Sequence, residues 1–402
     1  MDFSTIELDA AHQKLQDEIR TFIAENLTPD VYEHELETGD NFNEKVHLAM
    51  GERGWIMPHW PKERGGAGLD RLGVHILEQE FEKAKLPSVT LGTTRLVVAS
   101  VERYGSDEIR DDVLAGVANG TVRICLGYTE PHGGSDIAGA KARAVKDGSD
   151  WVINGSKMFT TGAHNSQYTF LITRSDPTLP KHKGLTMFLV PLDTPGIEIQ
   201  GIRAFSGERT NMVFYDDVRV DEKYLLGEPN GGWTVLRGPL DEEHSIGDGD
   251  TDGLDEVSVG WMFIRELYDA FEGALDWANA PGDDRKRPAD DPAIVERLGR
   301  IAIETNAALV TPGPSGRVKG GEAIVSAGAE LLDLLGPEGL ISQGQPDAIA
   351  GGQPEYVHRY AQGTVTYGGT VEVFRTIIAQ HELGLPRPTY PGSKVLPTTT
   401  SA

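Results

Sequence analysis

The sequence predicts a multidomain α+β protein in which a β-rich middle part lies between two helical parts. Apolar residues recur at helical spacing before Gly120 and again after Gly232, and β-branched and aromatic runs with turn dipeptides fill the stretch between them. A chain of 402 residues is long enough for two or three domains. We therefore expect an N-terminal helical domain over residues 1–124, a middle β-barrel-like domain over 125–230 and a C-terminal helical bundle over 231–402.

The N-terminal part shows its helical periodicity from the start. Apolar residues separated by charged ones recur at near-helical spacing, at Leu8, Leu15, Ile19 and Phe22. Gly105 followed by Ser106 predicts the end of one helix and the cap of the next. The stretch 54–69 is punctuated by proline and glycine and predicts a loop, in which Trp55 and Trp60 are expected to be core residues.

The middle part carries the signals of β-hairpins. Two turn dipeptides, Asp147-Gly148 and Asn154-Gly155, flank the apolar run 151–153 and predict tight turns at both of its ends. β-Branched and aromatic residues predict further strands over residues 168–173, 185–190 and 212–220.

Helical spacing returns in the C-terminal part. It is found over residues 259–278, 292–309, 322–335 and 370–383. Between these stretches, residues 281–292 predict a charged connection, and residues 339–354, rich in glycine, glutamine and proline, predict a mobile loop. Residues 313–321 contain glycines and lysine but lack the GK[ST] ending of a phosphate-binding loop, and they predict a linker into a helix.

Charge and cysteine content exclude several functions. Acidic residues outnumber basic ones by 62 to 37, which gives a net charge of −25. Such a surface repels phosphate backbones and anionic lipid, so we expect no binding to nucleic acid or to membranes. The single cysteine, Cys125, excludes an intrachain disulfide and is expected to be a buried small hydrophobe. No apolar run is long enough to span a bilayer, and the acidic start resembles neither a secretory signal nor a transit peptide, so the expected location is the cytoplasm.

Signals for metals and nicotinamide cofactors are weak. Residues 248–253 (DGDTDG) mimic the start of an EF-hand loop, but the twelfth position of that loop is Val259 instead of glutamate, so we expect a solvated acidic loop. No GxGxxG string follows a strand, which disfavours a nicotinamide-binding domain. The histidines show no paired spacing typical of a metal site, and we expect none.

The stretch from Leu126 to Asp136, LGYTEPHGGSD, gathers hydroxyls, a carboxylate and two glycines on one turn. Pro131 restricts Glu130 to an extended backbone, and the glycines allow a tight turn that a ligand can approach closely. The string resembles the TEPxxGSD flavin-binding signature of the acyl-CoA dehydrogenases. Further segments resemble the same family in the same order, namely residues 154–161 (NGSKMFTT), 213–227 (VFYDDVRVDEKYLLG) and 367–372 (YGGTVE) leading into 383–387 (LGLPR).

The resemblance implies the acyl-CoA dehydrogenase fold and an FAD cofactor, because protein side chains cannot accept a hydride. Thr129 and Ser135 are implied to contact the flavin from the first loop. Thr161 is implied to donate to the flavin ring, with Phe159 packed against the ring where the family usually has tryptophan. The implied cofactor-binding set is Leu126, Tyr128, Thr129, Gly134, Ser135, Phe159, Thr160, Thr161, Thr370 and Glu372. The implied substrate-binding set is Ser135, Gly368, Gly369 and His244.

The base that removes the α-proton is where this sequence departs from the family. Many members have a glutamate in the string YEGT, but here the string is YGGT, and Gly368 retains only a backbone N–H for the thioester oxygen. A minority of members carry the glutamate on the first helix after the β-domain, in a stretch like LDxER. Residues 240–244 (LDEEH) lie at the matching distance, so Glu243 is the expected catalytic base, with Glu242 as its rival by one residue. An acidic pair at a helix start is also explained by stabilisation of the helix dipole on a solvated face, but the missing YEGT glutamate favours catalysis. His244 stands where the family usually has arginine.

The segments that reach a neighbouring subunit's flavin in homotetrameric relatives are also altered. In place of RxxFG and QxxGGxG segments, the chain has 284–288 (DRKRP) and 334–339 (LLGPEG), without the phenylalanine and the glutamine. Actinobacterial relatives that act on sterol side chains have this look, including an ending like YGGTxEVFRxxIAQ, and work as α2β2 heterotetramers with a second acyl-CoA dehydrogenase-like chain.

The resemblance therefore implies the base-bearing subunit of such a complex. It would dehydrogenate a bulky, steroid-type acyl-CoA and pass electrons to an electron-transfer flavoprotein. The alternatives are a fatty or branched short-chain acyl-CoA dehydrogenase homotetramer, a non-catalytic partner subunit, and a flavin oxidase or monooxygenase on the same fold.

Overall fold

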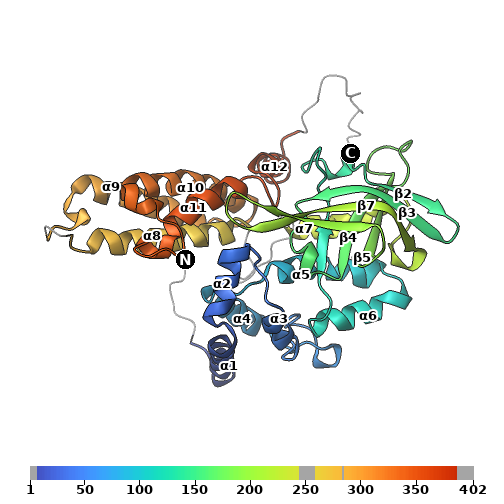
Figure 1. The fold of residues 1–402 in the computed structure, drawn as a ribbon, viewed down its shortest axis with the longest axis horizontal. Coiled ribbons are helices and arrows are strands. Elements are labelled where there is room, and N and C mark those ends of the chain that lie inside the picture. The colour runs from blue at the N-terminus through green and yellow to red at the C-terminus, as the bar shows by residue number, and fades with distance from the viewer. Residues whose placement is uncertain (1–6, 244–258, 283–284, 387–402) are drawn as a thin grey trace, which may run out of the picture.

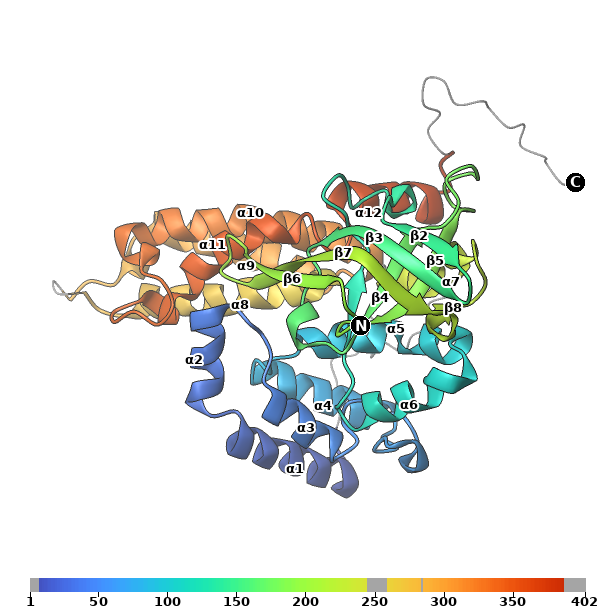
Figure 2. The same ribbon diagram turned by 45° about the vertical axis from the view of Figure 1, so that its right-hand side comes forward.

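The computed structural model describes residues 7–243, 259–282 and 285–386, and for residues 241–243 and 259–262 it describes the backbone alone. Figures 1 and 2 show three parts that follow one another along the chain: N-terminal helices, a twisted β-sheet, and an elongated helical bundle that extends to one side. The predicted helical–β–helical order is confirmed. The predicted acidic loop 248–253 lies outside the described residues.

The helices of the N-terminal part begin at side chains that cap them. Asp9, Asn43 and Asp70 each accept a backbone N–H from the first turn of the helix that follows. Gly105 ends one helix as predicted, and Ser106 precedes the next, but the Ser106 hydroxyl donates to the carbonyl of Lys223 at 2.8 Å instead of forming a cap. The helices are α1 (Ala10–Asn26), α2 (Pro29–Thr38), α3 (Glu44–Gly51), α4 (Arg71–Lys83), α5 (Val89–Tyr104) and α6 (Asp107–Ala118), with the 3-10 turn η1 (Lys62–Arg64) in the predicted loop.

The middle part is one mixed sheet. Its strands are β1 (Ile124–Gly127), β2 (Arg143–Asp147), β3 (Asp150–Met158), β4 (Tyr168–Arg174), β5 (Leu185–Pro191), β6 (Ile197–Arg203), β7 (Arg209–Asp221) and β8 (Leu225–Leu226). They are ordered β6-β7-β3-β2-β4-β5-β8, and β1 pairs in parallel with β4. Gly148, with φ 65°, makes the predicted turn between β2 and β3.

The predicted turn at Asn154-Gly155 is wrong, because both residues lie inside β3. The register between β3 and β7 shifts between Ile153 and Gly155, which marks a bulge. Gly155 has φ 144°, and a Cβ added to it would lie 2.7 Å from the Cα of Ala142. Glycine therefore serves a bulge and a close backbone approach at this position, not a chain reversal.

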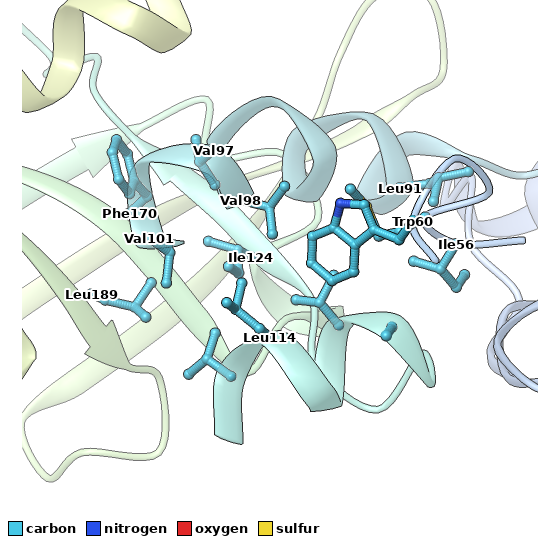
Figure 3. Packing of buried hydrophobic residues seen from close by; sticks show 14 of the residues in the cluster. Ile56, Trp60, Leu91, Val97, Val98, Val101, Leu114, Ile124, Phe170 and Leu189 are labelled. Carbon is cyan, nitrogen blue, oxygen red and sulfur yellow. The ribbon is translucent and has the colours of Figure 1, made fainter. Parts of the chain in front are cut away.

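A shared hydrophobic core joins the N-terminal helices to the sheet. In Figure 3, side chains of α5 and α6 interdigitate with side chains from β1, β4 and β5, among them Val98, Ile124 and Phe170. Trp55 and Trp60 belong to this core, as predicted. The other face of the sheet buries a second cluster that contains Cys125, so the prediction for the cysteine is also confirmed.

The C-terminal part consists of α7, which packs back onto the sheet, and a bundle with a core of its own. The predicted linker at 313–321 is wrong, because α10 begins at Gly313 and includes all of it. Glycines here leave room for neighbours: a Cβ added to Gly321 would lie 3.1 Å from Val371 Cγ1. The helices are α7 (Gly232–Glu243), α8 (Val259–Asn279), α9 (Pro292–Leu309), α10 (Gly313–Leu335), α11 (Gln353–Thr364) and α12 (Val371–Ile377). Short turns of helix are η5 (Pro288–Asp290), η6 (Gly336–Leu340), η7 (Ile349–Gly352) and η8 (Ile378–Glu382).

In both ribbon views α12 lies at the end of the bundle that is nearer the sheet, and it packs against α10. No helix within the described ranges combines the length and the apolar character needed to cross a membrane.

Candidate active site

The loop after β1 is fixed by a buried ion pair. The Glu130 carboxylate lies 2.8 Å from Nζ of Lys157 on β3, and the two side chains are 4% and 0% exposed. Glu130 also accepts the backbone N–H groups of Lys141 and Ala142, at 2.8 and 2.9 Å. Burial raises the pKa of Glu130, but Lys157 and these donors outweigh it and hold the pKa below its usual value. Burial lowers the pKa of Lys157 to about 8, so both groups are charged at pH 7.

This ion pair places the first loop against the end of β3. The N–H of Met158 donates to the carbonyl of Thr129 at 2.9 Å. A tight turn follows as predicted, closed by two hydrogen bonds between Glu130 and Gly133 at 3.2 and 3.0 Å. Neither glycine of the turn has a positive φ, so the turn does not depend on the left-handed region. Among the predicted flavin contacts of this loop, Tyr128 is buried, Ser135 is exposed, and Leu126, Thr129 and Gly134 are half-buried.

The residues that follow β3 present an aromatic ring and hydroxyl groups. Phe159 has φ 60°, and its side chain is 56% exposed. A left-handed backbone is rare and strained for a bulky residue, and such strain clusters at functional sites. The hydroxyls of Thr161 and Thr210 lie 3.0 Å apart, and Thr160 exchanges backbone and side-chain hydrogen bonds with the fully buried Asn211.

These residues fit the ring end of a flavin. A flat conjugated ring needs an exposed apolar face to stack on and donors at its edge. Phe159 offers the face and Thr161 offers a hydroxyl beside it. The Thr160 hydroxyl is buried without a hydrogen-bond partner among the described residues.

A hydrogen-bonded network behind Thr160 was not predicted. Nε2 of His164 lies 3.0 Å from the Asp40 carboxylate, and Nδ1 of His164 lies 3.2 Å from the side-chain amide of Asn211. The network runs from a loop of the N-terminal helices to the strand that supports Thr160. Asp40 is more than 120 positions away from His164 in the sequence, so no local pattern points to their contact.

The YGGT segment forms the loop between α11 and α12. Gly368 and Gly369 have φ 63° and 84°, in the region that favours glycine. Thr370 caps α12 by accepting the N–H of Val373 at 3.2 Å. The Glu372 side chain is exposed and lies 3.7 Å from Arg375 on the same helix.

Arg317 of α10 holds this loop, and sequence reasoning missed it because residues 313–321 were predicted to be a linker. Its Nη2 donates to the carbonyls of Thr364, Tyr367 and Gly369, the last two at 2.9 Å. The side chain is fully buried.

Comparison with known proteins identifies the family. Residues 9–121 match the family model described as acyl-CoA dehydrogenase, N-terminal domain, and residues 125–218 match the middle domain of the same family. The chain is 30% identical over 401 residues to the acyl-CoA dehydrogenase FadE29 of Mycobacterium tuberculosis, an alignment that covers 95% of this chain and 99% of that relative. The chain belongs to the acyl-CoA dehydrogenase family. It is an oxidoreductase that acts on the CH–CH group of acyl-CoA thioesters, so the predicted family and enzyme class are confirmed.

Solved structures of acyl-CoA dehydrogenases share the architecture over nearly the whole chain. The ChsE4–ChsE5 complex from Mycobacterium tuberculosis matches with a TM-score of 0.79 and 27% identity, covering 96% of this chain and 100% of that one. The Tcur3481–Tcur3483 steroid ACAD matches with a TM-score of 0.78 and 29% identity, with the same coverage. The predicted acyl-CoA dehydrogenase fold is therefore confirmed.

Within this acyl-CoA dehydrogenase, the predicted site residues fall into separately held groups. Hydrogen bonds bring the first loop, with Thr129, to the strand end that carries Phe159 and Thr161. Residues 368–372 form a second group, held by Arg317 next to α12. Glu243 is the last residue of α7. The side chains of Glu242 and Glu243, and all of His244, lie outside the described residues.

Proposed function

We propose that this acyl-CoA dehydrogenase is the base-bearing subunit of a heteromeric, FAD-dependent complex that dehydrogenates a bulky, steroid-type acyl-CoA at its α and β carbons. The observation that carries the proposal is Gly368. It occupies the usual position of the catalytic glutamate, and its φ of 63° is unfavourable for a residue with a side chain. The loop therefore offers no carboxylate there, and proton removal falls to Glu243 at the end of α7, with Glu242 as the rival.

The proposed roles divide between cofactor and substrate. The set that would hold FAD is Leu126, Tyr128, Thr129, Gly134, Ser135, Phe159, Thr160, Thr161, Thr370 and Glu372. FAD, when bound, supplies the acceptor for the hydride that leaves the β-carbon. The Gly368 N–H donates to the thioester oxygen and so acidifies the α-carbon. Glu243 takes the α-proton. Ser135, Gly369 and His244 complete the proposed substrate contacts.

The assembly and the substrate class are supported by similarity. One of the similar solved structures is described as the Tcur3481–Tcur3483 steroid ACAD, a name that gives two different chains. The other is a complex of ChsE4 with ChsE5. The chain also lacks the phenylalanine and the glutamine expected at 284–288 and 334–339, as a chain whose flavin site is completed by a different partner would. An electron-transfer flavoprotein is the proposed electron acceptor.

The base assignment is tested by Glu243→Gln in the flavin-loaded complex. Without the carboxylate, anaerobic bleaching of the flavin by acyl-CoA should slow by about 10²- to 10⁴-fold, the usual contribution of a positioned base. Stopped-flow absorbance measures the rate. Glu242→Gln is the matched control and should bleach at nearly the wild-type rate. The opposite pattern would transfer the role to Glu242.

A non-catalytic partner subunit is the second candidate, favoured by the same missing carboxylate at Gly368. Wild-type rates in both glutamine variants would support it, because the base would then belong to the other chain. Co-purification from the native host with mass spectrometry identifies that chain. Purification of this chain alone with stoichiometric FAD and full turnover would contradict the heteromeric assembly.

A further inference from the structure

We infer that Arg317 is a positioning residue that aims the Gly368 N–H at the thioester oxygen. The inference rests on the proposed function, because that function gives the Gly368 N–H its role. Arg317 is fully buried, and no contact with substrate or cofactor is proposed for it. It acts through the backbone of the loop between α11 and α12.

The contacts of Arg317 converge on that loop. One guanidinium nitrogen, Nη2, donates to the carbonyls of Thr364, Tyr367 and Gly369. Nε and Nη1 have no hydrogen-bond partner in the described part of the chain, so the guanidinium acts through Nη2. A Cβ added to Gly321 would lie 3.0 Å from Nη1, which shows how closely α10 is shaped around this side chain.

Peptide planarity turns these contacts into an orientation. In a trans peptide, the carbonyl of one residue and the N–H of the next point in opposite directions, and the described backbone contains no cis peptide. Because the Tyr367 carbonyl points at Arg317, the Gly368 N–H points away from α10. The Gly369 carbonyl fixes the N–H of Thr370 in the same way. Two consecutive glycines have little conformational preference, so the orientation needs an external hold.

Within the described ranges, no carboxylate pairs with the charge of Arg317. Its guanidinium carbon lies 4.9 Å from the ring centroid of Phe263 and 5.4 Å from that of Phe374, and its hydrogen bonds go to backbone carbonyls. Burial lowers its pKa to about 10, so it stays charged at neutral pH. A buried cation balanced only by dipoles and ring faces is a costly way to fill space compared with an apolar side chain. Positioning the loop explains why an arginine lies there.

The test is the apparent pKa at which acetoacetyl-CoA, bound to the flavin-loaded complex, forms its enolate, followed by ultraviolet absorbance. A donor aimed at the thioester oxygen stabilises the enolate and lowers this pKa. Arg317→Met removes the donors at similar length, and it should raise the pKa by about one unit or more. It should also lower kcat by about 10- to 100-fold, with KM changed less than about threefold. Arg317→Lys keeps a charged donor and should recover about half of the pKa shift.

The matched control is Arg297→Met in the same bundle. Arg297 of α9 bonds Glu330 of α10 at 2.6 Å, far along α10 from Arg317, so its loss should leave the enolate pKa unchanged whatever it does to thermal stability. An unchanged enolate pKa in folded, flavin-loaded Arg317→Met overturns the inference. If that variant does not fold, Arg317→Lys decides: a shift of about half a unit supports the inference and no shift overturns it. A wild-type complex that neither bleaches nor binds acetoacetyl-CoA overturns the proposed function itself.

Discussion

The loop after β1 and the loop before α12 are each held by a buried cation from a neighbouring element, but the charge is balanced differently. Lys157 meets the Glu130 carboxylate at 2.8 Å, and that carboxylate also binds two backbone N–H groups. Arg317 meets three backbone carbonyls and two aromatic rings. The loop after β1 thus supplies a carboxylate as the counter-charge for Lys157, whereas the loop before α12 supplies only backbone carbonyls to Arg317.

The comparison of Lys157 with Arg317 shows what a buried basic side chain needs in order to stay protonated. His47 is a third case: its ring is 5% exposed, and burial, followed by the nearby charges of Arg123 and Arg95, lowers its pKa to about 4. The imidazole is therefore neutral at pH 7. Lys157 keeps its proton beside a carboxylate, and Arg317 keeps its proton because the pKa of a guanidinium begins so high.

The largest effect is expected from Lys157→Met. This change leaves the Glu130 carboxylate buried without its cation, and breaking a buried pair from one side typically costs about 3–5 kcal/mol of unfolding free energy. Denaturant unfolding of the wild type and the variant measures the difference. Since Glu130 fixes the loop that is proposed to hold the flavin, we also expect weaker flavin retention.

Two controls show whether the cost comes from burial. Lys181 pairs with Asp136 at 2.8 Å, but the side chains are 53% and 61% exposed, so Lys181→Met should cost less than about 1 kcal/mol. The double variant Glu130→Gln with Lys157→Met should be more stable than Lys157→Met alone, because no charge is then left unpaired. Equal losses for Lys157→Met and Lys181→Met would mean that burial does not decide the cost of breaking these two ion pairs.

A smaller effect is expected from the pH dependence of His47. Its folded pKa of about 4 lies below the ordinary 6.5, so between these values the unfolded chain binds the proton and the folded chain does not. The stabilisation is complete above pH 6.5 and is lost as the pH falls towards 4, by about 3 kcal/mol in total. Unfolding free energies of the wild type and His47→Gln, measured across this range, should therefore converge or cross as the pH falls.

His12 gives a control of opposite sign. Its pKa is raised, chiefly by the hydrogen bond to Asp70. It therefore stabilises the fold below its unfolded value of 6.5 and loses that contribution as the pH rises. His12→Gln should lower stability more in acid than at neutral pH. A parallel response of the two histidine variants would contradict the assignment of His47 as a buried neutral ring.

Periodicity predicted the order of the three parts because burial patterns repeat within single helices and strands. Periodicity gave wrong predictions where a contact with a distant part of the chain determines the local structure. A glycine signals a turn or a bulge equally well, and for Gly155 the pairing with β7 and the approach of Ala142 decide. Glycines disfavour a helix by about 1 kcal/mol each, but packing overrides that preference in α10.

The candidate site also depends on contacts between distant parts of the chain, which leave no local pattern in the sequence. Thr129, Phe159 and Thr161 lie in contiguous motifs, so the sequence could point to them. Arg317 could not be found, because its partner carbonyls are about 50 positions away and carry no side-chain signature. Resemblance points to residues within contiguous motifs more readily than to the distant residues that hold those motifs in place.

The smallest effects are expected when one glycine in each of the two loops is replaced by alanine. Gly368 has φ 63°, so Gly368→Ala should lose about 1 kcal/mol of unfolding free energy from left-handed strain. Gly133 has no left-handed φ, and a Cβ added to it meets nothing within 4 Å. Gly133→Ala should therefore leave stability unchanged or raise it by up to about 1 kcal/mol. Thermal and denaturant unfolding measure both. Equal losses of unfolding free energy would mean that both loops need glycine to the same extent. They would contradict the view that left-handed backbone conformation distinguishes the loop before α12 from the loop after β1.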